Sequence, residues 1–83
     1  MSSQVADDII CVVAQVLKKN KDEIDRAASF KSLGADSLDM FEMILKWEDI
    51  FVVEISDDEL EGIKSISDVT RLIENKCLQK KEP

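Results

Sequence analysis

Histidine is absent from this 83-residue chain, and residues that shape turns and rings are scarce: two glycines, one proline, three phenylalanines, one tryptophan and no tyrosine. Without histidine the chain lacks the usual general base at neutral pH, the histidine-dependent nucleophile pairs and the commonest metal ligand. We therefore do not expect a self-contained hydrolase and identify no catalytic residue. Few glycines and prolines beside 45% apolar residues argue against disorder, collagen and turn-rich β folds and favour compact helices.

Cysteine is also rare, because the chain has only Cys11 and Cys77. Their separation fits neither a C-x-x-C redox pair nor a zinc site, which needs four soft ligands, so we expect no metal site. We expect two unpaired thiols, with Cys11 in the core and Cys77 half exposed. Unpaired thiols suit a reducing compartment.

No run of 18 apolar residues occurs, and residues 1–8 lack the basic flank and apolar stretch of a signal peptide. We therefore expect a cytoplasmic protein with no membrane insertion. A chain of this length predicts one domain over residues 1–83 with a small core. We expect order over about 4–77 and a frayed tail over 78–83.

Acidic residues are what the chain has in excess: 18 against 11 basic ones, a net charge of −7. Ten of the acids lie between residues 36 and 61, where Lys46 is the only basic residue. A charge run by itself is more often only a solvated face. A surface of this sign repels nucleic acid and anionic lipid and favours protein partners with basic patches.

Apolar residues at three- and four-residue steps over 4–18 predict a first helix that ends near Asn20. Residues 21–35 predict a long loop, held to the core at Ile24, Phe30 and Leu33, with a short turn around 22–25. Further helices are predicted over 36–51, over 56–62 and from Ser65 onward, each opened by an Asp or Ser cap. The expected fold is an all-α small four-helix bundle with a long first loop and a short third helix.

The helix predicted over 36–51 carries two apolar stripes instead of one. The stripe that we assign to the core contains Met40, Met43, Ile44, Trp47, Ile50 and Phe51. Leu38, Phe41 and Leu45 form a second stripe, about 130° away. This second stripe either packs on a loop or another helix, or stays exposed as a docking surface for a protein partner.

Ser37 stands at the start of the same helix. A serine there is ordinarily a cap, but Asp36 is the better-placed cap, with Asp39 in the first turn. The Ser37 hydroxyl would then be free at the positive helix end, where an attached phosphate is tolerated.

The stretch Leu33-Gly34-Ala35-Asp36-Ser37-Leu38, followed by Asp39 and Glu42, resembles the signature of the acyl carrier proteins, of the free-standing bacterial or organellar type. The resemblance covers about residues 5–75. It also includes Ala28-Ser29-Phe30, Glu48, Phe51, Glu54-Ile55, Asp57-Asp58-Glu59 and Ile63.

The resemblance implies that Ser37 carries 4'-phosphopantetheine, transferred from coenzyme A by a phosphopantetheinyl transferase. Acyl groups are then held on the arm as thioesters and presented to fatty-acid biosynthesis enzymes through basic docking patches. A monomer is expected. By position, the docking residues are Asp36, Leu38, Asp39, Phe41, Glu42, Leu45 and Glu48, and a cavity for the acyl chain is expected near Met43, Ile44, Trp47 and Ile63.

The chain departs from the family pattern at Lys31-Ser32, Lys46 and Trp47. Alternatives are a carrier of aminoacyl, peptidyl or polyketide units, and an unmodified acidic interaction module. A calcium-binding regulator is a third alternative, although the loop from Asp57 to Asp68 matches the calcium pattern poorly.

Overall fold

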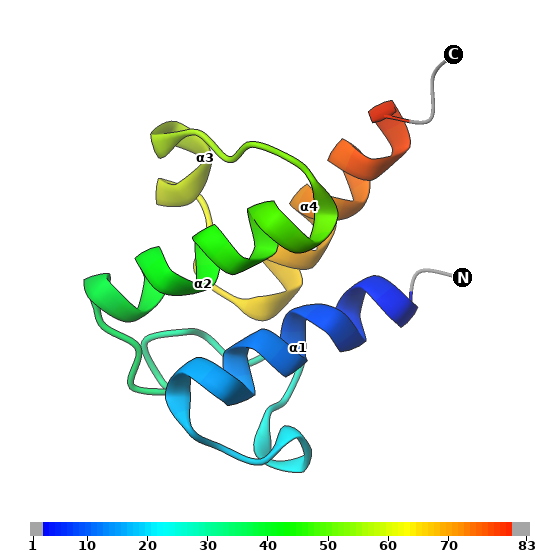
Figure 1. The fold of residues 1–83 in the computed structure, drawn as a ribbon. Coiled ribbons are helices and arrows are strands. Elements are labelled where there is room, and N and C mark those ends of the chain that lie inside the picture. Colours follow the sequence, from blue (N-terminus) through cyan, green and yellow to red (C-terminus); the bar gives the residue numbers. More distant parts are fainter. Residues whose placement is uncertain (1–2, 81–83) are drawn as a thin grey trace.

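The computed structural model describes residues 3–80, and residues 1–2 and 81–83 lie outside it. Its elements are α1 (Ser3–Leu17), a short 3-10 helix η1 (Lys21–Glu23), α2 (Ser37–Phe51), α3 (Asp57–Glu61) and α4 (Ile66–Lys80). Figure 1 shows α1 and α2 side by side in front of α4, with α3 beyond α2. The predicted all-α fold, with its long first loop and short third helix, is confirmed.

Apolar side chains from α1, α2 and α4 meet in one core, because each helix carries them on one face. The fully buried ones are Ile9, Val13, Met43, Trp47, Ile66, Val69 and Ile73. Each contributes roughly 1.5–3 kcal/mol through burial. Among the described residues no polar or charged one is buried, so apolar packing holds the three long helices together.

The long loop between α1 and α2 is held to this core at the predicted positions. Ile24 and Phe30 are buried and Leu33 is partly buried. The Phe30 N–H also donates a hydrogen bond to the Lys64 carbonyl, at 3.0 Å. The loop before α2 is therefore joined to the segment between α3 and α4.

Reciprocal hydrogen bonds cap α3 and α4, as the sequence predicts. The Ser56 hydroxyl accepts from the Glu59 N–H at 3.2 Å, and the Glu59 carboxylate accepts from the Ser56 N–H at 3.0 Å. The same two bonds join Ser65 and Asp68, at 3.3 and 3.2 Å. The Ser56 N–H, followed by the Lys76 ammonium, holds the pKa of Glu59 below its ordinary value. Lys76 lies 3.0 Å from that carboxylate and so joins α3 to α4.

Two side-chain predictions were wrong. Ile50, assigned to the core, is 49% exposed, although it lies at nearly the angle of the fully buried Met43 on α2. Burial also needs a neighbouring element at the same level along the helix, and the last turn of α2 lacks sufficient cover there. Cys11, also expected in the core, is only partly buried, as is Cys77, for which this was predicted.

Two helix ends differ from the predicted boundaries. α1 ends at Leu17, before Asn20, because Lys18 takes a left-handed conformation with φ 58°. α4 includes residues 78–80, where the sequence predicted a frayed tail, and the rest of that tail lies outside the described residues. No described helix combines the length and the apolar character that a membrane span requires.

Candidate functional site

The N-terminus of α2 is closed by a reciprocal cap between Asp36 and Asp39. The Asp36 carboxylate accepts from the Asp39 N–H at 2.8 Å, and the Asp39 carboxylate accepts from the Asp36 N–H at 3.3 Å. Since Asp36 is the cap, Ser37 is the first helical residue and is exposed. No hydrogen bond between described residues occupies its hydroxyl. The hydroxyl is thus accessible at the positive end of a 15-residue helix.

Gly34 turns the chain into this cap. Its φ of +85° lies in the left-handed region that side chains rarely adopt, and an added Cβ would meet nothing within 4 Å. Its N–H donates to the Lys31 carbonyl at 3.1 Å, and the Ala35 N–H donates to the Phe30 carbonyl at 3.0 Å. Backbone conformation, and not lack of space, therefore favours glycine here.

An open pocket of about 570 Å³, called here the Ser37 pocket, lies beside the Ser37 side chain. It is built from the loop before α2, the first turns of α2 and the segment from α3 to α4. Its wall is apolar and its rim polar; the wall consists of Phe30, Ala35, Met40, Leu60 and Ile63, and the rim of Ser29, Lys31, Asp36, Ser37 and Lys64. An accessible hydroxyl beside an apolar wall fits a group that is attached to Ser37 and rests against the protein.

Of the four residues predicted to lie near an acyl cavity, Ile63 lines the Ser37 pocket. Met43, Ile44 and Trp47 do not line this pocket; they are buried in the core, to which the sequence also assigns them, at 0%, 5% and 0% exposure. Phe30 separates the two regions, because it lines the pocket and its ring centroid lies 6.1 Å from that of Trp47. The buried Trp47 Nε1 has no hydrogen-bond partner among the described residues.

The sequence did not single out Met40, Leu60 or the two rim lysines as pocket residues. Met40 was assigned to the core, and Phe30 only to the attachment of the loop. The pattern around Leu60 and Ile63, two apolar residues on either side of the end of α3, was the one local signal. It does not say that this segment faces Ser37.

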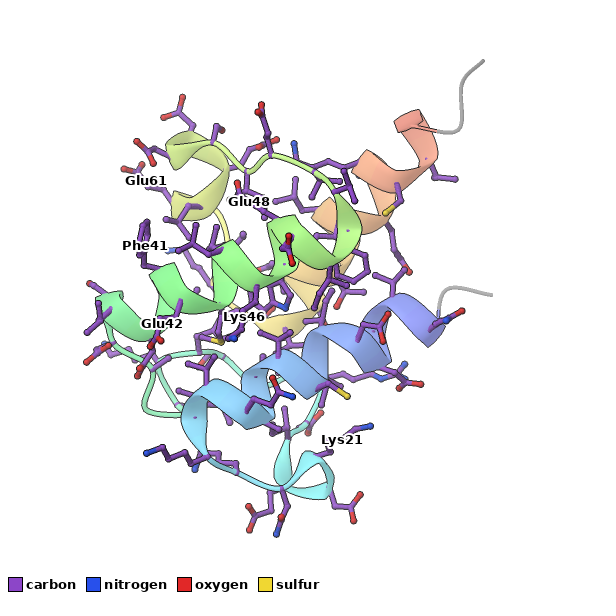
Figure 2. The ribbon with its side chains drawn as sticks, in the orientation of Figure 1. Lys21, Phe41, Glu42, Lys46, Glu48 and Glu61 are labelled. Carbon is purple, nitrogen blue, oxygen red and sulfur yellow. The ribbon has the colours of Figure 1, made fainter. Side chains whose placement is uncertain are left out.

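Three exposed apolar side chains, spaced three and four residues apart, lie along one face of α2 and are called here the α2 strip. They are Leu38, Phe41 and Leu45, at 68%, 56% and 49% exposure. The exposed Ile50 lies on a different face of the helix. The strip thus lies outside the core, which resolves the alternative that it packs within the fold. Figure 2 shows Phe41 with Glu42 on the N-terminal half of α2.

The predicted docking acids differ in what their carboxylates do. Glu42 is exposed and forms no ion pair with a described residue. The carboxylates of Asp36 and Asp39 serve the cap. The Glu48 carboxylate accepts a hydrogen bond from the Ile55 N–H at 2.8 Å, and Figure 2 shows it on the side of α2 toward α3. Glu48 therefore also holds the linker between α2 and α3.

Known proteins are similar to this chain in sequence. Residues 7–73 match the family model described as phosphopantetheine attachment site. The chain is 42% identical over 71 residues to an acyl carrier protein of Wolinella succinogenes, covering 84% of this chain and 93% of that one. It is 41% identical over 73 residues to an acyl carrier protein of Helicobacter pylori, covering 87% and 94%.

The fold is similar to a solved structure as well. The crystal structure of an acyl carrier protein from Thermotoga maritima matches with a TM-score of 0.81 at 23% identity, covering 98% of this chain and 94% of that one. At this identity the likeness concerns the fold alone.

Proposed function

The chain belongs to the acyl carrier protein family, and from this premise we propose that Ser37 is the residue that carries its phosphopantetheine group. The chain is a carrier of acyl groups in fatty-acid synthesis, with covalently bound 4'-phosphopantetheine as cofactor. When bound, this group supplies a flexible arm whose terminal thiol holds acyl groups as thioesters. The protein acts as the substrate that other enzymes load and unload.

The observation that carries this proposal is that Asp36 caps the helix while the adjacent Ser37 hydroxyl forms no hydrogen bond with a described residue. The Asp36 carboxylate accepts from the Asp39 N–H, one of the free backbone donors at the start of the helix, so Ser37 is not needed as the cap. The Ser37 hydroxyl is exposed, and the positive end of α2 favours an attached phosphate. A modifying enzyme can therefore reach this oxygen without unfolding the helix.

We further propose that partners dock on the α2 strip and on the acids around it. Its three apolar side chains supply the desolvated centre of an interface, while Asp36, Asp39, Glu42 and Glu48 supply a negative rim. Such a surface suits a phosphopantetheinyl transferase and fatty-acid synthesis enzymes that present basic patches. The carrier would meet these enzymes by diffusion, as a cytoplasmic monomer.

The acyl chain is proposed to enter the fold through the Ser37 pocket. Ile63 and Phe30 lie at its wall, and Trp47 lies behind Phe30. Met43, Ile44 and Trp47 are buried in the close-packed core, so a long chain has to displace them. A short chain needs only the pocket.

Loading tests the attachment site directly. The chain is incubated with coenzyme A, magnesium and a broad-specificity phosphopantetheinyl transferase, and its intact mass is measured before and after. We expect the parent to gain one phosphopantetheine group and Ser37→Ala to gain none. Ser67→Ala is the control, at a serine in the first turn of α4. It removes an exposed hydroxyl that donates to the Arg26 carbonyl at 2.9 Å, so it tests the effect of losing a structural hydroxyl and should leave loading unchanged.

Loss of helix content in Ser37→Ala, measured by circular dichroism, would instead give this serine a structural role. No mass gain in a folded, unmodified parent would refute Ser37 as a phosphopantetheine site.

A further inference from the structure

Two lysines stand at the rim of the Ser37 pocket, on two segments that the Phe30–Lys64 backbone hydrogen bond joins. Lys31 belongs to the loop before α2, and Lys64 to the segment between α3 and α4. Both are exposed, and neither forms an ion pair with a described residue. Their charges are therefore available to an anion at the pocket.

The backbone holds both lysines in place. The Phe30 N–H donates to the Lys64 carbonyl at 3.0 Å, and the Gly34 N–H donates to the Lys31 carbonyl at 3.1 Å. Ser29 and Ser65, next to these residues, form an isolated antiparallel bridge. The backbone positions of both lysines are thus fixed before a ligand binds, which lowers the entropic cost of binding.

The positive charge of these two lysines contrasts with the negative charge of the chain as a whole and of the cap beside Ser37. The chain carries a net charge of −7, and the carboxylates of Asp36 and Asp39 lie at the cap beside Ser37. An anion attached to Ser37 is repelled by both carboxylates, while the end of α2 and the two lysines attract it. The rim thus offers compensating charge for an anionic group at Ser37, above an apolar wall.

We propose that Lys31 and Lys64 together bind the phosphodiester of the arm on Ser37 and keep the resting arm against the wall of the Ser37 pocket. This inference rests on the proposed attachment at Ser37 and deepens it. The two lysines are not needed for the arm to be attached. They determine how often the arm lies on the protein and how often it extends toward a partner.

The test uses the loaded protein and the phosphorus nucleus of the arm. A held phosphodiester tumbles with the protein, whereas one that is not held also rotates about the bonds that join it to Ser37, so its ³¹P transverse relaxation is slower. The variants are Lys31→Gln, Lys64→Gln and the double variant. Lys21→Gln, on η1, is the control, because it makes the same charge change at an exposed lysine that does not line the pocket (Figure 2).

An exposed ion pair shifts an equilibrium by up to about fivefold, so we expect each pocket variant to lower the held population by roughly two- to fivefold. The double variant should lower it further, and Lys21→Gln should match the parent. Raising the salt to about 1 M should lower the held population of the parent toward that of the double variant, because charges are then screened over about 3 Å. Lys64→Arg, which keeps the charge, should behave as the parent.

Equal ³¹P relaxation in the parent and the double variant, with unchanged melting temperatures, would overturn the inference. An equal effect of Lys21→Gln would also overturn it, because the cause would then be net charge and not the pocket. Intact mass separates these results from failure of the proposed function. A parent that gains no arm overturns both, and a loaded parent without held phosphate overturns only this inference.

Discussion

Glu48 links the surface of α2 to the segment that positions α3. Its part-buried carboxylate accepts a hydrogen bond from the Ile55 N–H, seven residues away, at 2.8 Å. A hydrogen bond to a charged group contributes roughly 1.5–3 kcal/mol, and partial exposure lowers this to about 1–2 kcal/mol. We expect Glu48→Ala to reduce the free energy of unfolding by that amount, which lowers the melting temperature by about 4–16 °C in a domain of this size.

The matched control for this loss is Glu42→Ala, on the same helix. Glu42 is exposed and forms no ion pair with a described residue, so its removal should change stability by less than about 0.5 kcal/mol. Glu48→Gln keeps an acceptor oxygen and loses only the charge, so we expect a loss of about 0.5–1 kcal/mol. Urea unfolding followed by circular dichroism measures all three, with a constant slope as the check on two-state behaviour.

Glu48 should matter more than Glu42 for stability, whereas Glu42 should matter more than Glu48 for the rate of loading. At low salt, Glu42→Lys should slow recognition by a basic transferase, and the effect should fade as the ionic strength rises. Glu48→Lys, which makes the same charge change, should have a smaller effect on the rate, because Glu48 is part-buried on the side of α2 toward α3. Equal stability losses for Glu48→Ala and Glu42→Ala would refute the linker role, and an unchanged loading rate of Glu42→Lys at low salt would place docking elsewhere.

Four further substitutions test the backbone and the caps. Gly34→Ala should cost about 1 kcal/mol because of the positive φ, whereas Gly62→Ala, where a Cβ meets only the Glu59 carbonyl oxygen at 3.5 Å, should be close to neutral in thermal melts. Val52 ends α2 in a left-handed conformation with φ 54°, so Val52→Gly should raise stability by about 0.5–1 kcal/mol, and a lower melting temperature would contradict this. The Ser56 N–H holds the pKa of Glu59 below its ordinary 4.5, so the ionised group stabilises the fold above that pH and this contribution is lost as the pH falls through the lowered pKa. The difference in melting temperature between the parent and Glu59→Gln should therefore be constant above pH 4.5 and shrink below it; a difference that grows on acidification would refute this.

Features that depend on residues a few positions apart were predictable from the sequence. The caps Asp36–Asp39 and Ser56–Glu59 each join residues three apart, so the helix starts follow from local chemistry. The angular separation of Phe41 from the core face follows from the helix period, whereas the structure decided that the α2 strip stays exposed. The free Ser37 hydroxyl is a consequence of the same local cap.

Features that depend on distant segments were decided by the tertiary structure. Ile50 has the right angle for burial but lacks cover at its level of α2, and Glu48 binds the backbone of a linker whose path the helix period does not fix. The Ser37 pocket joins Lys31 and Lys64 because a backbone hydrogen bond between Phe30 and Lys64 draws their segments together. The sequence by itself thus determined the helices, their caps and the accessible serine, since these arise within one or two turns. Only the packing of segments some thirty residues apart decided which side chains surround that serine.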